Sequence, residues 1–99
     1  FYEWNKNGEK NAFRREDGKA LYMAGIADLF DEEIRFVILT TTPNASMHGI
    51  HDRMPLILRR DQIRPWLTDA ESALHLLAAP PPLLERHSTD GQMSFGDLL

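Results

Sequence analysis

Cysteine is absent from this chain of 99 residues. The chain therefore contains no disulfide, no thiolate metal ligand and no thiol nucleophile of its own. Long apolar runs are missing as well, because no stretch approaches the roughly 20 residues that a membrane-spanning helix needs. No secretory pattern is visible at the N-terminus. From these absences we expect a cytoplasmic protein that does not use a membrane.

Basic residues are outnumbered by acidic ones, and the formal net charge is -4. This balance argues against a generally basic protein that binds nucleic acid without specificity, although it leaves room for a local basic groove. Hydrophobic residues make up 42% of the chain, which is enough for a modest core in one domain at most.

The four histidines do not form a recognisable metal motif. His48 and His51 are three residues apart, whereas His75 and His87 are remote from them. No carboxylate stands at a known zinc-ligand spacing from any of them, so we expect neither a metal nor another cofactor.

Strand and helix patterns follow one another along the chain without an internal repeat. Five segments are predicted to be strands: residues 1–4, 12–15, 20–28, 34–41 and 54–58. Three segments are predicted to be helical. They are a short turn started by Thr42-Pro43-Asn44 and ended by Gly49, a helix capped by Asp61 that runs through Leu67, and a helix opened by Thr68-Asp69-Ala70-Glu71 and ended by Pro80-Pro81-Pro82. The pattern predicts an α+β fold, in which a mostly antiparallel sheet or open β-barrel carries short peripheral helices.

The same pattern predicts how three of these segments pack. Asp17-Gly18 should form a hairpin turn, because this pair readily takes positive φ. Branched residues fill residues 34–41, which is typical of a strand buried on both faces. In the last helix Ala70, Leu74 and Leu77 should lie along one apolar stripe, with Ala73 beside them.

The most informative stretch is Ile50-His51-Asp52-Arg53-Met54-Pro55. Pro55 favours an extended backbone before it, so His51 and Arg53 should point to one side and Asp52 to the other. An imidazole transfers protons near neutral pH and a guanidinium is always charged, so the pair can act together on a phosphate-bearing ligand. In the alternative interpretation the segment is merely polar and exposed, and a surface ion pair of Arg53 contributes about 0–1 kcal/mol.

Two further residues are candidates for a site. Glu3 lies between aromatic residues in Phe1-Tyr2-Glu3-Trp4, and dry surroundings there would suit a general acid or base. Its alternative is an ordinary exposed strand carboxylate. Thr40 ends the strand predicted at 34–41, where its hydroxyl can face a ligand or simply reflect β propensity. Trp4 and Trp66 are interpreted as core residues rather than as platforms for stacking bases.

These stretches together resemble the SRAP family (SOS response-associated peptidase). The family's two signatures are matched by Phe1-Tyr2-Glu3-Trp4 and Ile50-His51-Asp52-Arg53-Met54-Pro55. Between the signatures the family has a strand that runs into a threonine, matched by Phe36-Val37-Ile38-Leu39-Thr40, and after them a Trp-Leu pair, matched by Trp66-Leu67. The resemblance covers roughly residues 1 to 78. It departs at Ala24-Gly25-Ile26-Ala27, where the family often has Ala-Gly-Leu-Trp, and this affects one packing aromatic rather than the site.

The resemblance implies a sensor of abasic sites in single-stranded DNA. In that family an N-terminal cysteine, positioned by an upstream asparagine, attacks the ring-opened aldehyde and closes a thiazolidine that crosslinks protein to DNA. The peptidase name refers to self-processing at the N-terminus. Carried over residue by residue, Glu3 is the catalytic glutamate, His51 assists proton transfer beside the sugar, and Arg53 and Thr40 contact DNA phosphate.

Because the chain opens within a predicted strand, we expect it to be the C-terminal part of a longer domain, whose N-terminal part would be a partner. Residues 1–79 are assigned to this portion of the domain and residues 80–99 to a proline-led tail, which from Leu83 should form one edge strand followed by polar residues. In the tail, Gln92-Met93-Ser94-Phe95 resembles a peptide that docks on the replication sliding clamp, with Gly96 in place of the second hydrophobe. The alternative is a disordered tail. The resemblance also implies association with the nucleoid.

A rival function remains open on the sequence alone. The chain could be a noncovalent module that binds single-stranded DNA or another protein, having lost the chemistry. The two functions are distinguished by whether a segment beginning Met-Cys accompanies this chain.

Overall fold

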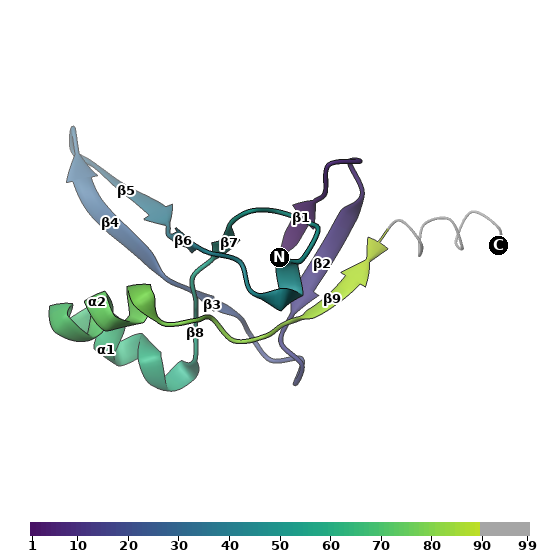
Figure 1. The fold of residues 1–99 in the computed structure, drawn as a ribbon. Helices are drawn as coiled ribbons and strands as arrows, with labels where there is room; N and C mark the ends of the chain where they lie inside the picture. Colours follow the sequence, from purple (N-terminus) through teal and green to yellow (C-terminus); the bar gives the residue numbers. More distant parts are fainter. Residues whose placement is uncertain (90–99) are drawn as a thin grey trace.

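The computed structural model describes residues 1–89, which form short strands, two single turns of 3-10 helix and two α-helices (Figure 1). The strands are β1 (Tyr2–Trp4), β2 (Lys10–Arg14), β3 (Tyr22–Met23), β4 (Gly25–Phe30), β5 (Glu33–Ile38), β6 (Thr40–Thr41), β7 (Met54–Pro55), β8 (Ile57–Leu58) and β9 (Glu85–Ser88). The helical elements are η1 (Ala45–Met47), η2 (Arg60–Gln62), α1 (Ile63–Thr68) and α2 (Ala70–Ala78).

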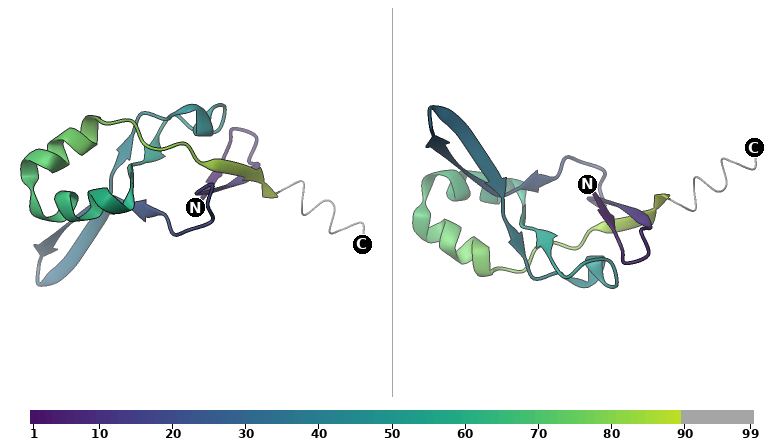
Figure 2. Two further views of the ribbon diagram at one scale, coloured as in Figure 1. Left: turned by 90° about the horizontal axis from the view of Figure 1, so that it is seen from below. Right: turned by 90° about the horizontal axis from the view of Figure 1, so that it is seen from above.

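All strand pairs in the described part of the chain are antiparallel. Strands β1, β2 and β9 form a three-stranded sheet, while β3 pairs with β8, β4 with β5, and β6 with β7. Figures 1 and 2 place the three-stranded sheet at one end of the molecule and the two α-helices at the other, with the β4–β5 hairpin projecting outward. The predicted α+β class is confirmed, and residues 1–89 form no closed barrel.

The core lies on both sides of residues 54–58. Met54 and Ile57 join a cluster with Phe13, Met47 and Leu84, whereas Leu56 and Leu58 join a second cluster with Ala24. Both clusters are buried because the short strands β7 and β8 each have a partner, and Trp66 and Leu76 cover the second cluster. The prediction of a core strand at 54–58 is therefore confirmed, although the strand is interrupted at Leu56.

The turn at Asp17-Gly18 forms, but the hairpin predicted around it does not. The backbone N–H of Gly18 donates to the carbonyl of Arg15 at 3.0 Å, and Gly18 has φ of 71°. The strands on either side then separate, because β2 pairs with β1 and β9 while β3 pairs with β8. The hairpin prediction was wrong because a turn fixes local direction, whereas strand pairing depends on which apolar faces meet.

The strand predicted to be buried on both faces is exposed. Seven large hydrophobic residues of β4 and β5 are between 43% and 79% exposed, namely Ile26, Leu29, Phe30, Ile34, Phe36, Val37 and Ile38. Strand β5 pairs with β4 across a tight turn, in which Asp31 and Glu32 both have positive φ. No second layer within residues 1–89 covers this hairpin. The branched residues correctly predicted a strand here, but they did not predict whether other elements would bury it.

The last helix begins one residue later than expected. Asp69, not Thr68, is its N-cap, accepting from the backbone N–H of Glu71 at 3.2 Å and from the Ser72 hydroxyl at 2.7 Å. The Ser72 hydroxyl, followed by the Glu71 N–H, holds the pKa of Asp69 below its usual value. Thr68 instead ends α1, where its hydroxyl donates to the carbonyl of Arg64.

The face of α2 that packs inward differs from the predicted stripe. Leu74 is 67% exposed and Leu77 is 42% exposed, whereas Leu76 packs against the core. The predicted stripe is therefore not the face that meets the core, because apolar spacing along a helix does not show which side a neighbouring element covers. Helix α2 ends at Ala78, before the prolines, as predicted.

Two further predictions concern single elements. Asp61 does not cap a helix, since it lies within η2 and the N-cap of α1 is Gln62. The edge strand expected after the prolines is present as β9, which extends the sheet beside β2. No helix within residues 1–89 has the length and apolar character needed to cross a membrane.

Candidate functional site

The site predicted from sequence lies on residues 49–53, which connect η1 to β7. Met47 at the start and Met54 at the end of this connection are almost fully buried. Ile50 packs against the same core cluster, so the connection is fixed along its length as well as at its ends. Gly49 has φ of 76°, a conformation that residues with a Cβ rarely adopt, and this turns the chain from η1 into the site.

Arg53 and Thr40 are brought together by strand pairing. The antiparallel pair β6–β7 sets Thr40 opposite Pro55, two residues after Arg53. From there the guanidinium donates through Nε to Thr40 Oγ1 at 3.2 Å and through Nη2 to the Thr40 carbonyl at 2.8 Å. Arg53 has no carboxylate partner within residues 1–89, so neither Asp52 nor the acidic residues 31–33 neutralise it.

The His51 imidazole meets two groups through the same nitrogen. Nδ1 lies 3.1 Å from the backbone nitrogen of Arg53 and 3.1 Å from Asp52 Oδ1. A bare Nδ1 accepts the Arg53 N–H, whereas a protonated Nδ1 donates to the carboxylate, so the two contacts belong to different protonation states. When Nδ1 gains a proton, its hydrogen bond with the Arg53 N–H is therefore replaced by one with the Asp52 carboxylate, so both the neutral and the protonated imidazole have a partner.

The side-chain directions differ from the simple alternation predicted for an extended strand. Asp52 was expected to point away from His51, yet its carboxylate contacts the imidazole. The reason is that the backbone bends at Asp52 and becomes a strand only at Met54. The prediction that His51 and Arg53 share a face assumed an extended strand through residues 51–53. Because those residues do not form a strand, alternation gives no support for a shared face.

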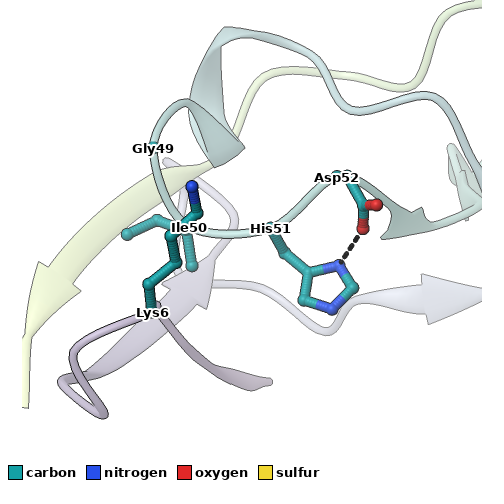
Figure 3. Close-up of a pocket in the computed structure, with 5 residues that line it drawn as sticks. All are labelled: Lys6, Gly49, Ile50, His51 and Asp52. Carbon is teal, nitrogen blue, oxygen red and sulfur yellow. Dashed lines mark ion pairs between the residues drawn. The ribbon is translucent and has the colours of Figure 1, made fainter.

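A cavity of about 590 Å³ adjoins this connection. It is lined by Lys6, Gly49, Ile50, His51 and Asp52 (Figure 3). In Figure 3 the Lys6 side chain runs beside Ile50, while His51 and Asp52 lie together farther along the chain. The cavity is therefore bordered by a cation at one end and by an imidazole–carboxylate pair at the other.

Glu3 lies on β1, half-buried and opposite Asn11 of β2. Because side chains alternate along a strand, Glu3 shares a face with Phe1. Phe1 stacks on Phe13 at a centroid distance of 5.1 Å and packs against the cluster that also contacts Ile50. Glu3 is not among the residues that line the cavity. The catalytic role that the resemblance implies for Glu3 stays a prediction.

The aromatic residues beside Glu3 occupy the other face of β1. Tyr2 and Trp4 are 54% and 51% exposed, and the Lys10 ammonium lies 4.1 Å and 5.6 Å from their ring centroids. Trp4 is therefore not a core residue, contrary to prediction, because β1 is covered on one face only. Trp66 does pack in the core, and its Nε1 donates to the carbonyl of Gly25 at 3.1 Å.

Sequence reasoning did not select two of the residues that line the cavity. Asp52 stood within the motif but received no role, and Lys6 appeared only as part of a polar turn. The signal for Asp52 was its position between two candidates. Nothing local distinguished Lys6, because only the fold of the β1–β2 hairpin brings it to residues 49–52. Within residues 1–89 there is no group of three side chains that could hold a metal ion.

Comparison with known proteins identifies the family of the chain. The model of the SOS response associated peptidase (SRAP) family matches residues 1–92. The chain belongs to the SRAP family. Among curated SRAP-like relatives, the abasic site processing protein YedK of Escherichia coli (strain K12) is 34% identical over 74 residues, covering 68% of this chain and 33% of YedK.

A second relative gives a similar match. The abasic site processing protein YoaM of Bacillus subtilis (strain 168) is 32% identical over 76 residues, covering 68% of this chain and 34% of YoaM. The chain therefore spans about a third of the length of the curated SRAP relatives that it matches. The predicted clamp-binding segment, Gln92 to Phe95, lies outside the described residues.

Proposed function

We propose that this SRAP chain supplies the phosphate-binding and acid–base groups of a site that captures abasic sites in single-stranded DNA. One observation carries the proposal: Thr40 holds the uncompensated guanidinium of Arg53, and the backbone N–H of the same residue donates to Nδ1 of the His51 imidazole. The abasic-site names of two relatives indicate the kind of DNA that such a site would receive.

The phosphate-binding role of Arg53 follows from how its side chain is held. Two hydrogen bonds to Thr40 fix the plane of the guanidinium without neutralising it. Its remaining N–H groups have no partner within residues 1–89, and the fork of an arginine suits phosphate oxygens. Thr40 would then orient Arg53 and present its own hydroxyl at the edge of the same contact.

The acid–base role would be shared between Glu3 and His51. Opening the ring of an abasic sugar requires a proton on the ring oxygen while the proton of the anomeric hydroxyl is removed. A half-buried carboxyl group can deliver the first, and an imidazole can take or return the second. Glu3 shares a face of β1 with Phe1, which packs against the same core cluster as Ile50, and this placement supports the division of labour.

The nucleophile would come from a segment that this chain does not contain, since it has no cysteine. The α-amine and thiol of an N-terminal cysteine would condense with the aldehyde carbon, forming one C–N and one C–S bond and releasing one water. The product would be a thiazolidine that crosslinks the protein to DNA. The family name further suggests self-processing at that N-terminus.

The segment with the cysteine would also complete the fold. The exposed hydrophobic residues of the β4–β5 hairpin form an apolar surface larger than scattered single residues would produce. We propose that the N-terminal part of the same SRAP domain packs on this hairpin. The two roles are linked, because docking there would hold the cysteine in a fixed position relative to His51 and Arg53.

The absence of cysteine also favours a second candidate function. Without a partner segment, the chain would bind single-stranded DNA noncovalently through Arg53 and its neighbours. The intact mass of the protein isolated from its source would distinguish the two, since covalent capture needs a segment beginning with cysteine after removal of methionine.

A crosslinking assay tests the main proposal. The chain alone, and the chain together with the cysteine-bearing segment, are incubated with an abasic oligonucleotide and separated on a denaturing gel. We expect a shifted band only when the cysteine is present. A shifted band from the chain alone would contradict the cysteine mechanism, and no band from either would leave only the noncovalent function.

The role of Glu3 has its own test in the same assay. We expect Glu3→Gln to slow crosslinking by roughly 10²–10⁴-fold if Glu3 is the principal acid. Binding to undamaged single-stranded DNA should hardly change, because a carboxylate would not contact phosphate. Glu9→Gln, on the following turn, is the matched control. Crosslinking of Glu3→Gln at the normal rate would make Glu3 structural.

A further inference from the structure

The β1–β2 turn carries a cation to the cavity beside His51. Lys6 lines this cavity together with residues 49–52, although it is distant from them in sequence. Its ammonium group has no hydrogen bond or ion pair within residues 1–89. The one carboxylate that shares the cavity belongs to Asp52, and it is engaged with His51.

The turn that carries Lys6 is held firmly by the preceding residue. The Asn5 side-chain oxygen accepts the backbone N–H groups of Asn7 and Glu9 at 3.0 and 2.9 Å. The Asn5 backbone adds hydrogen bonds with Glu9 and Gly8, each of 3.0 Å. An asparagine that bonds to the backbone ahead of it fixes a turn of defined shape. The Cα of Lys6 is therefore fixed, and only its side chain adapts to a ligand.

Lys6 and Arg53 flank His51 from opposite directions along the chain. Lys6 lies beside Ile50, before His51 (Figure 3). Arg53 follows His51 in the chain and is held by Thr40. Residues 49 to 53 are at most about 14 Å long in an extended backbone. An anionic polymer lying along this segment would thus meet one cation on each side of the imidazole.

We propose that Lys6 is a second phosphate contact, which binds the DNA backbone on the side of the abasic nucleotide opposite to that held by Arg53. This inference rests on the proposed function, since it takes single-stranded DNA as the ligand of the site. Two contacts on different phosphates place the lesion sugar between them, at His51. A lysine suits this task because its flexible ammonium acts as a point charge, whereas Arg53 provides fixed direction.

Salt-dependent binding tests the proposal without requiring any chemistry. The ligand is a fluorescent single-stranded oligonucleotide with a tetrahydrofuran abasic analogue, which has no aldehyde, and binding to the protein is followed by anisotropy. We expect Lys6→Ala to reduce the slope of log affinity against log salt by about 0.7, the contribution of one phosphate contact on single-stranded DNA. Lys6→Arg should retain the slope.

Two comparisons separate a specific contact from a general effect of charge. Lys19→Ala removes the same charge from the exposed turn after β2, outside the cavity, and should leave the slope unchanged. The double variant Lys6→Ala/Arg53→Ala should reduce the slope by about 1.4, because different phosphates contribute independently. Circular dichroism of each variant verifies that the fold is kept.

The outcomes are distinguishable from a failure of the proposed function. An unchanged slope for Lys6→Ala, or an equal reduction for Lys19→Ala, would overturn the role of Lys6 even if the protein crosslinks normally to a true abasic site. Conversely, a protein that never crosslinks but shows the expected slopes would retain Lys6 as a phosphate contact and lose only the covalent chemistry.

Discussion

Two apolar stretches of this SRAP chain have similar sequences and opposite surroundings. Residues 34–38 and residues 54–58 are both rich in branched or large hydrophobic side chains. The first forms β5 in the projecting hairpin and is exposed at every position, whereas the second passes through the core and is buried at four of five positions. Composition therefore predicts a strand in both places but does not predict whether that strand is covered.

The difference arises from the number of partners that each stretch has. Residues 54–58 pair with β6 on one part and with β3 on the next, and they contribute side chains to both core clusters. Strand β5 pairs with β4 alone. The candidate site residues His51 and Arg53 lie directly before the covered stretch, so a well-packed region holds them, whereas β5 is left uncovered within residues 1–89.

The largest expected effect is on the β4–β5 hairpin, where docking of the N-terminal part of the domain should change how much a mutation lowers the free energy of unfolding. In this chain alone, Phe36→Ala should alter the free energy of unfolding by no more than about 0.5 kcal/mol, because the ring is exposed. In the presence of the N-terminal part of the domain, the same change should cost about 3–5 kcal/mol. Denaturant titrations of both forms measure the contrast, with Arg35→Ala as the control. Equal small effects in both forms would show that nothing docks on the hairpin.

Residues 54–58 should be sensitive to mutation both in this chain alone and in the presence of the N-terminal part of the domain. Leu56→Ala should reduce the free energy of unfolding by about 2–5 kcal/mol, because Leu56 is 2% exposed and its removal leaves a cavity in the second cluster. Urea titration with a constant m-value checks this expectation. A loss below about 0.5 kcal/mol, which is usual for surface positions, would erase the contrast between the two stretches.

Removing the hydrogen bond between Thr40 of β6 and Arg53 should have a moderate effect on DNA affinity. Thr40→Val removes the Oγ1 acceptor of Arg53 Nε but keeps the shape of the side chain and the carbonyl contact. We expect DNA affinity to fall by about twofold to tenfold, which corresponds to a net hydrogen bond of about 0.5–1.5 kcal/mol. Thr41→Val, on the next residue of β6, is the matched control. Identical affinities for the two variants would remove Thr40 from the site.

The smallest effect concerns the helix that supports the covered region. The pKa of Asp69 is lowered in the folded chain, so its charge stabilises the fold above the usual carboxyl pKa, and this stabilisation is lost as pH falls through the lower folded value. Asp69→Asn keeps a cap but has no charge to lose. Its melting temperature should therefore decline less than that of the unmodified chain between pH 5 and pH 3. Parallel declines would show that the charge of Asp69 is unimportant.

Local signals gave the positions of most elements and the residues of the motif. The proline run predicted the end of α2, and Asn44 and Gly49 predicted the helical turn before the site. These signals succeed because caps and turns are decided by a few adjacent residues. The hairpin at Asp17-Gly18, the burial of β5 and the inward face of α2 were mispredicted, because each depends on which distant surface packs against the element.

The sequence by itself determined the family motifs, the absence of a thiol and the identity of His51 and Arg53 as candidates. Only the tertiary structure decided that Thr40 holds Arg53, that Lys6 reaches the cavity beside His51, and that β5 is left uncovered. The physical reason is range. Turns, caps and strand propensities arise between neighbours in the chain, whereas these three outcomes depend on the register and pairing of strands whose residues are far apart in sequence.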